Sequence, residues 1–281
     1  MPGRFCGILK VAGPGLRTDC WRVPLAAVPL QPDTDPMSTT ALAHLPKEGP
    51  PDLLYLLFHG VGATAENMAP LALRLAHEYP QAAVICLNGP EPCDAVFDDG
   101  TSGDNAIGRQ WFSIRLVNDA NRAGRVAAAL PLFIATVRAL QARFDIGWER
   151  TALAGFSQGA IMALEAVQAE PQLAGRVLAF SGRHVDAPAH APADTTVHLF
   201  HGMEDSVIPY RASVESAQCL VALGGDVTAD VLPGLGHALH TELMDKAIGQ
   251  LRSFLPKKVW RQAMSEAPVI PRAAASDALG E

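Results

Sequence analysis

The sequence predicts an α/β fold, in which a mostly parallel central sheet carries helices on both of its faces. Short apolar runs alternate with segments of helical periodicity from residue 53 to residue 254. These runs are bounded by Gly, Pro and Asp, the residues that end strands. The chain of 281 residues is 49% hydrophobic and 18% charged, as in globular proteins. It is long enough to bury a large core in one domain.

The first strand is predicted at Leu53–Phe58, because the run LLYLLF is short and apolar and lies between Pro51 and Gly60. A helix, a second strand, a loop rich in Gly, Asp and Pro, and a long helix are then predicted at residues 65–79, 82–87, 88–108 and 119–144. The later strands are predicted at 151–154, 176–180, 196–200 and 226–232, and the helices between and after them end near residues 169, 223 and 254.

This series predicts one domain over residues 37–256. Residues 1–36 contain six prolines and no periodicity, and they are predicted to be a disordered extension, with the natural polypeptide starting at Met37. Residues 257–281 are predicted to be a peripheral tail.

Composition restricts the partners and the compartment. A net charge of −7 argues against a nucleic-acid partner. The five cysteines form no CxxC pair, which is typical of free thiols in a reducing compartment. No apolar run approaches the length of a membrane span, and the N-terminus lacks the apolar segment of a secretory signal. We therefore expect a cytoplasmic protein without a membrane span, as a monomer or homodimer.

The segment Gly155–Gly159 reads GFSQG and matches the pattern G-x-S-x-G. In this pattern a serine lies on a sharp turn between a strand and a helix, and glycines let the two elements approach. The pattern arises by chance in about one chain in ten of this size, and the serine could merely cap a helix. The strand before it and the apolar helix after it favour Ser157 as a nucleophile, with the Gln158 amide as an oxyanion donor.

Candidates for the base and its acidic partner follow Ser157 in the order that this kind of site requires. Glu204 and Asp205 come after a predicted strand, and Asp205 is preferred because its shorter side chain holds an imidazole more rigidly. His237 directly follows the turn PGLG after the last strand. His240 is expected to begin the last helix as a surface histidine. We therefore predict His237 as general base and Asp205 as the group that orients it.

Two further segments lie near this predicted site. The loop His59–Gly62 closes the first strand, and the Val61 amide is predicted as the second oxyanion donor. A tight turn without function would need the same glycines. Trp111 and Phe112 either line an acyl pocket or belong to the core.

The sequence does not favour a metal or a cofactor. His198 and His201 lie three apart in a predicted strand, so that their side chains point to opposite faces. His237 and His240 lack the Glu of an HExxH motif, and no phosphate-binding glycine motif is present. We predict that neither a metal nor another cofactor is needed.

Five segments together, LLFHGVG, GRQWFS, GFSQGAIMALE, HGMED and GLGHA, resemble the phospholipase/carboxylesterase group, which includes acyl-protein thioesterases, and within it small bacterial cytosolic esterases. The resemblance covers residues 53–256. It implies an α/β-hydrolase fold, with Ser157, Asp205 and His237 as the triad and the amides of Val61 and Gln158 as the oxyanion hole. The family usually has Asp where this chain has Ala63, which bears on how the loop is anchored.

Residues and resemblance together predict a serine carboxylic ester hydrolase that acts on small short-chain acyl esters through an acyl-enzyme. An acyl thioesterase, acting on acyl-CoA or on acylated proteins, is the nearest alternative. A non-catalytic binding protein of the same fold is the other alternative, because a fold does not fix a function.

Overall fold

The computed structural model describes residues 42–94, 108–256 and 259. The predicted extension at 1–36 with its start at Met37, and the predicted tail at 257–281 apart from Val259, lie outside the described residues. The three cysteines within the described ranges, Cys86, Cys93 and Cys219, are free thiols.

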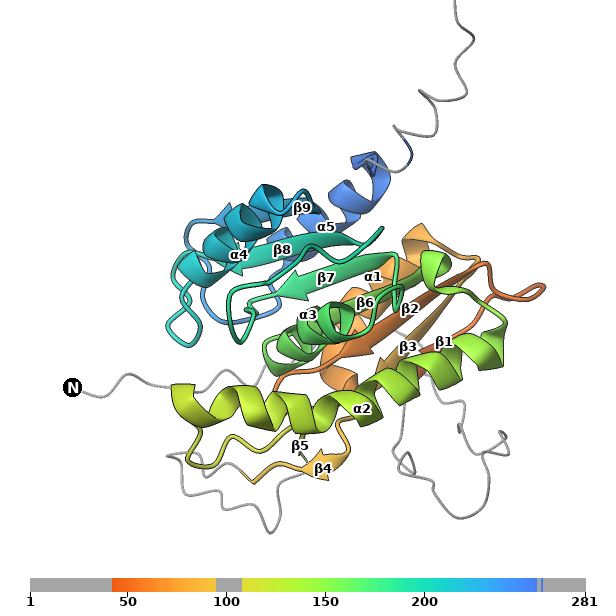
Figure 1. Ribbon diagram of the computed structural model, residues 1–281. Coiled ribbons are helices and arrows are strands. Elements are labelled where there is room, and N and C mark those ends of the chain that lie inside the picture. Colours follow the sequence, from red (N-terminus) through yellow and green to blue (C-terminus); the bar gives the residue numbers. More distant parts are fainter. Residues whose placement is uncertain (1–41, 95–107, 257–258, 260–281) are drawn as a thin grey trace, which may run out of the picture.

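A seven-stranded sheet forms the centre of the molecule (Figure 1). Its strands are β1 (Leu42–His44), β2 (Leu53–Phe58), β3 (Ala82–Leu87), β6 (Thr151–Phe156), β7 (Arg176–Phe180), β8 (Thr196–Gly202) and β9 (Asp226–Leu232). Their order is β1-β3-β2-β6-β7-β8-β9. All neighbours are parallel except β1 and β3, which are antiparallel. Two short strands, β4 (Glu91–Pro92) and β5 (Arg109–Gln110), form a separate antiparallel pair.

Helices cover both faces of the sheet, as expected for parallel strands. They are the 3₁₀ helices η3 (Ala65–Met68) and η4 (Trp148–Arg150) and the α-helices α1 (Ala69–Glu78), α2 (Asp119–Phe144), α3 (Gln158–Ala169), α4 (Arg211–Ala222) and α5 (Thr241–Ser253). Helices α2, α3 and α4 contribute to one core, and α1 and α5 to the other (Figure 1).

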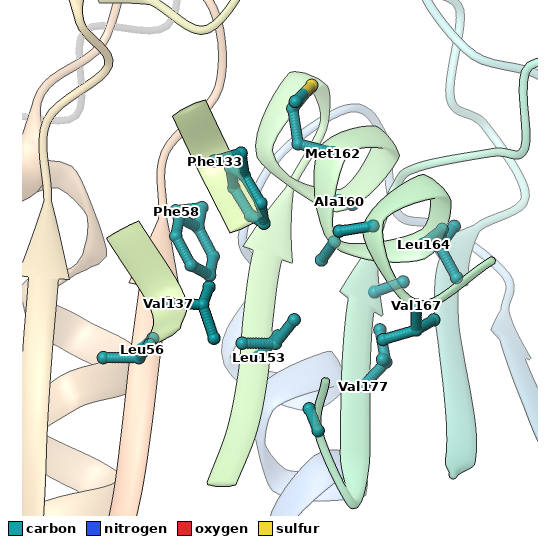
Figure 2. Packing of buried hydrophobic residues seen from close by; sticks show 14 of the residues in the cluster. Leu56, Phe58, Phe133, Val137, Leu153, Ala160, Met162, Leu164, Val167 and Val177 are labelled. Carbon is teal, nitrogen blue, oxygen red and sulfur yellow. The ribbon is translucent and has the colours of Figure 1, made fainter. Parts of the chain in front are cut away.

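The core under α2 and α3 is built from large apolar side chains of the central strands. The rings of Phe58 from β2 and Phe133 from α2 lie 4.4 Å apart between their centroids. Figure 2 shows them facing each other, beside Val137 and Leu153. Because β2 and β3 are buried on both faces, their sequences are continuous apolar runs.

Most elements have their predicted positions, and the differences have local causes. The segment predicted as one helix at 65–79 starts as η3 and becomes α1 near Pro70, which takes a position in the first helical turn where no amide hydrogen bond is lost. The position of strand β1 was not predicted, because three residues at a sheet edge carry too little pattern. Strands β4 and β5, with two residues each, fall at the ends of the segment predicted as a loop.

Helix α2 is, among the described residues, the one helix long and apolar enough to cross a membrane by length and composition. Core helices of soluble proteins meet the same criterion. Its Val126, Phe133, Val137 and Leu140 are buried in the core against the sheet. The criterion is therefore weak evidence for a membrane span.

Strand β2 lies between β3 and β6 in the sheet. The strand that follows β2 in sequence, β3, pairs with one of its edges, and β6, with the later strands beyond it, pairs with the other. Phe58 at the end of β2 pairs with Gly155 of β6. The loops after β2 and β6 therefore emerge side by side at the carboxyl edge, which is where open α/β sheets bind ligands. Glycine is required here: a Cβ on Gly159 would lie 2.2 Å from the Phe58 carbonyl oxygen, and one on Gly155 would lie 2.3 Å from the Gly159 backbone.

Gly159→Ala tests this close approach. We expect it to destabilise the protein by more than about 2 kcal/mol, because the methyl group would meet backbone atoms that cannot move independently. The matched control is Gly249→Ala in the interior of α5, where a Cβ would meet nothing within 4 Å. This control should gain up to about 1 kcal/mol from reduced backbone entropy. Urea unfolding of both variants measures the difference, and equal stability of the two would contradict the steric argument.

Candidate active site

Ser157 lies on the turn between β6 and α3 and has φ 52° and ψ −114°. A positive φ is unfavourable for a residue with a side chain, and such strain is typical of functional turns. The turn is held by the Ser157 amide, which donates to the Phe180 carbonyl at 2.9 Å, and by the Ser157 carbonyl, which accepts from Ile161 N at 3.1 Å. The backbone thus carries the serine side chain out of the sheet edge at the start of α3.

Three predicted residues meet at this turn. Ser157 Oγ lies 3.0 Å from His237 Nε2, and His237 Nδ1 lies 2.7 Å from Asp205 Oδ2. The hydroxyl and the carboxylate are therefore connected through the two nitrogens of one imidazole. This arrangement can take a proton from a serine during nucleophilic attack.

The loops after β8 and β9 bring Asp205 and His237 together. Met203 N donates to the Leu232 carbonyl and Glu204 N to the Leu235 carbonyl, both at 2.9 Å. The two loops are packed so closely that a Cβ on Gly202 would lie 2.1 Å from the Leu235 oxygen. The contact between β8 and β9 thus continues into the loops that carry Asp205 and His237.

The Asp205 carboxylate has no exposed surface and accepts four hydrogen bonds. Oδ1 accepts from Val207 N at 2.8 Å and from Ile208 N at 2.9 Å. Oδ2 interacts with His237 and, at 3.1 Å, with His201 Nε2. Burial raises the pKa of Asp205, but the hydrogen bonds from His201, His237 and Ile208 outweigh burial and hold this pKa well below its usual range. A charged Asp205 keeps the proton on His237 Nδ1 and leaves Nε2 free to accept the serine proton.

The structure distinguishes between the two candidates for the acid, Glu204 and Asp205, and between the two candidates for the base, His237 and His240. Glu204 is exposed, whereas Asp205 is buried against His237. His240 precedes α5 at its N-cap, as expected, but its Nε2 is buried without a partner among the described residues, which differs from a surface histidine. Neither Glu204 nor His240 takes part in the hydrogen-bonded chain.

The loop after β2 is held by His59. Its Nδ1 lies 2.6 Å from the Gly60 carbonyl, and its Nε2 accepts from Gly89 N at 2.9 Å. Because C=O and N–H point in opposite directions across a trans peptide, the bond to the Gly60 oxygen also fixes the direction of the Val61 N–H. This N–H has no hydrogen-bond partner among the described residues, so it is available to a ligand.

Segment Arg109–Phe112 of the motif GRQWFS anchors this loop. The backbone of Arg109 exchanges hydrogen bonds with the loop, from Gly62 N at 2.9 Å and to the Ala63 carbonyl at 2.8 Å. Trp111 Nε1 donates to the His59 carbonyl at 2.9 Å. Ala63, which stands where the related family usually has Asp, is thus held through its backbone.

The side chain of Gln158 joins the same segment to the turn at Ser157. Its Oε1 accepts from Trp111 N at 2.8 Å, and its Nε2 donates to the Phe112 carbonyl at 2.6 Å. The sequence suggested only the Gln158 amide, so this clamp and the ring of His59 are functional candidates that sequence reasoning missed. The tripeptide Phe-His-Gly begins at the last residue of β2, at 58–60, and recurs at 200–202 at the end of β8. This repeat could have drawn attention to His59 and His201.

Trp111 and Phe112 are each 6% exposed and belong to the core. They also line a cavity of about 290 Å³ between α2, α3 and the β4 region, together with Met162 and Ala128. Ser157 and His237 are not among its lining residues. Trp111 and Phe112 therefore belong to the core, as one interpretation from the sequence had it, and their role as walls of an acyl pocket stays a prediction.

Within the described ranges, no group of three His, Cys, Asp or Glu side chains could hold a metal ion. His198 and His201 have separate partners. His198 Nε2 lies 3.1 Å from an Arg176 guanidinium nitrogen, and its Nδ1 lies 2.8 Å from Thr228 Oγ1.

A family model described as Phospholipase/Carboxylesterase matches residues 44–255. The chain is 44% identical to Esterase YpfH of Escherichia coli (strain K12) over 216 residues, 77% of this chain and 89% of that protein. It is 25% identical to Acyl-protein thioesterase 1 of Eremothecium gossypii over 240 residues, 78% of this chain and 95% of that protein. The crystal structure of esterase PE8 superimposes with a TM-score of 0.67 at 28% identity, covering 76% of this chain and 97% of that one. These likenesses confirm the predicted α/β-hydrolase fold.

Because His59 and His198 are buried, we expect the protein to lose stability in mild acid. Burial lowers the pKa of His59 to about 4 and that of His198 to about 3, against 6.5 for an exposed histidine. The folded protein therefore resists protonation while the unfolded chain accepts protons, and stability present above pH 6.5 is lost as the pH falls below it. From pH 7 to pH 5 the free energy of unfolding should fall by about 4 kcal/mol for the two groups together.

Urea unfolding at the two pH values measures this loss. His198→Leu removes one of the two titrations and should reduce the pH dependence by about half. A wild-type stability that does not change between pH 7 and pH 5 would contradict the assignment of both histidines as buried and neutral.

Proposed function

Since this chain belongs to the phospholipase/carboxylesterase family and is an ester hydrolase, we propose that it cleaves carboxylic esters through an acyl-enzyme formed on Ser157. The observation that carries the proposal is the unbroken hydrogen-bonded chain from Ser157 Oγ through His237 to Asp205. It starts on a strained turn at the carboxyl edge of the sheet. A non-catalytic binding protein would not need this chain.

In the first step, His237 Nε2 takes the proton of Ser157 as Oγ attacks the ester carbonyl. The carbonyl oxygen becomes an oxyanion, which the amides of Val61 and Gln158 stabilise by hydrogen bonds. Two features support these donors: Val61 N–H is unpartnered among the described residues, and Gln158 stands at the N-terminus of α3, whose dipole favours negative charge.

In the second step, the tetrahedral intermediate collapses and the protonated His237 gives its proton to the leaving alcohol. Water then enters and attacks the acyl carbonyl as His237 removes one of its protons. When this second tetrahedral intermediate collapses, the acid leaves and His237 returns the proton to Ser157 Oγ. Charged Asp205 stabilises the imidazolium in both halves of the reaction. Every proton thus moves through His237, and no metal or other cofactor is required.

The substrates that we propose are small short-chain acyl esters. Trp111 and Phe112 are held against the nucleophile turn by Gln158 and line the neighbouring cavity. Its volume of about 290 Å³ is at the lower end of ordinary ligand pockets, which favours a small acyl group. We further propose a cytoplasmic enzyme that acts as a monomer or homodimer.

A thioesterase is the second candidate, because the chain is similar to Acyl-protein thioesterase 1 over most of its length. The same nucleophile and base could serve either bond. Comparing kcat/KM for an oxygen ester and a thioester with the same acyl group separates the two functions. A higher value for the thioester would favour the second candidate.

Ser157→Ala should lower kcat on p-nitrophenyl acetate by about 10³-fold or more, because no nucleophile remains. Its stability should hardly change, since only a hydroxyl is lost. Two matched pairs test the partners: His237→Ala should be nearly inactive and His240→Ala active, and Asp205→Asn should lose far more activity than Glu204→Gln. Near-normal turnover by a folded Ser157→Ala protein would contradict the mechanism.

The proposed role of the cavity as the acyl pocket is tested by filling it with a larger side chain from its exposed side. Ala128→Phe should lower kcat/KM for hexanoyl esters about 10-fold more than for acetyl esters, because the ring takes the volume that a longer chain would need. Ala135→Phe is the control, since Ala135 is exposed on the same helix and does not line the cavity. An unchanged chain-length profile in Ala128→Phe would assign Trp111 and Phe112 to the core alone.

A further inference from the structure

His201 at the end of β8 is fully buried, and both of its ring nitrogens form hydrogen bonds. Its Nε2 lies 3.1 Å from Asp205 Oδ2 and 2.8 Å from the Ile208 carbonyl oxygen. Its Nδ1 lies 2.7 Å from Ser213 Oγ of α4. Asp205 therefore stands between two histidines, of which the proposed mechanism uses only His237.

These partners determine where His201 carries its proton. Nε2 faces two acceptors, a carboxylate and a carbonyl, so the proton must be on Nε2. Nδ1 then accepts the hydroxyl proton of Ser213, because its distance of 2.7 Å from Oγ is shorter than the 3.3 Å to the Gly182 carbonyl, the other acceptor for this single proton. Helix α4 thus fixes the tautomer that lets His201 donate to Asp205.

Both histidines donate to the same oxygen of Asp205. Two backbone amides occupy Oδ1, while Oδ2 receives His237 Nδ1–H and His201 Nε2–H. Without His201, Oδ2 would keep His237 as its single side-chain donor. Oδ2 would then be freer to move, and its negative charge would act more strongly on the proton of His237 Nδ1.

We propose that His201 is a positioning residue for ester hydrolysis, which holds Asp205 Oδ2 in line with His237 and weakens its pull on the His237 proton. This inference rests on the proposed function. A base that must both accept and return a proton in each cycle works best when its partner neither drifts nor holds the proton too firmly.

The surroundings contain few other ionisable groups. In the described part of the chain, the titratable side chains that form hydrogen bonds with Asp205 are His201 of β8 and His237 of the β9–α5 loop. From α4 the group facing His201 is Ser213, which is neutral and also lies 3.3 Å from the Gly182 carbonyl after β7. A change at His201 therefore acts on the acid–base pair and on no other charge in contact with it.

The first test compares His201→Leu with His201→Gln. Leucine fills a similar volume but donates no hydrogen bond, whereas the glutamine amide can still donate to Asp205. We expect His201→Leu to lower kcat by about 10-fold or more with KM within about 2-fold, and His201→Gln to stay within about 3-fold of the wild type. A purely structural role predicts that both variants lose activity in proportion to their lost stability.

The pH profile gives a second readout. With one donor fewer, the Asp205 carboxylate is more basic and stabilises the imidazolium of His237 more strongly. The acid limb of kcat/KM should therefore move to higher pH in His201→Leu and not in His201→Gln. His198→Leu controls for the loss of a buried histidine, since His198 lies in the same strand with Arg176 and Thr228 as its partners. His198→Leu should leave the acid limb of kcat/KM at the pH of the wild type.

Ser213→Ala is the milder variant if His201→Leu does not fold. It removes the group that fixes the His201 tautomer and should lower kcat about 2- to 5-fold, with the same direction of pH shift. Ser216→Ala, another buried serine of α4, is its control. If Asp205→Asn is inactive while the variants of His201 and Ser213 match their controls, the role of His201 is overturned and the triad stands. If Asp205→Asn keeps its activity, the proposed function itself fails.

Discussion

The positive φ of Ser157 is the constraint on which the site depends. A residue with a side chain holds such a conformation at a cost of about 1–3 kcal/mol, and the surrounding structure must over-determine it. Here the strand before the turn, the helix after it and the Phe180 carbonyl beside it fix the backbone from three directions. Gly159 lets α3 come close enough to β2 to complete this support. The strain is thus sustained by packing of the whole central sheet.

Two hydrogen-bonded assemblies flank this turn, and each is organised by a buried histidine. In one of them, neutral His59 holds the loop after β2, and Arg109 and Trp111 hold the same loop by hydrogen bonds to its backbone. On the acid side, His201 and two amides surround the Asp205 carboxylate. In both cases a histidine at a strand end uses both nitrogens, so that its orientation is fixed. The groups proposed to react therefore belong to loops whose backbone has little freedom.

Much of this could be predicted from the sequence, because the decisive patterns are local. Strand β3 and helix α2 have their predicted ends: the strand is a bounded apolar run, and the helix begins after the Asn118 cap and ends at left-handed Asp145. That Ser157, Asp205 and His237 would meet was predicted from motif and chain order, and their side chains do form one hydrogen-bonded chain. What could not be predicted depends on contacts between distant segments, such as the bonds of Gln158 to the backbone at 111–112. A three-residue edge strand also has too little pattern to be seen.

The central claim is that Ser157 is the nucleophile. Titration with a fluorophosphonate, followed by mass spectrometry of the intact protein and of its peptides, tests it most directly, because this reagent forms a stable bond with an activated serine. The account predicts one phosphonate per chain, on the peptide that contains Ser157, with esterase activity lost in proportion to labelling. Complete inactivation with the label on another residue, or full activity with Ser157 fully labelled, would contradict it.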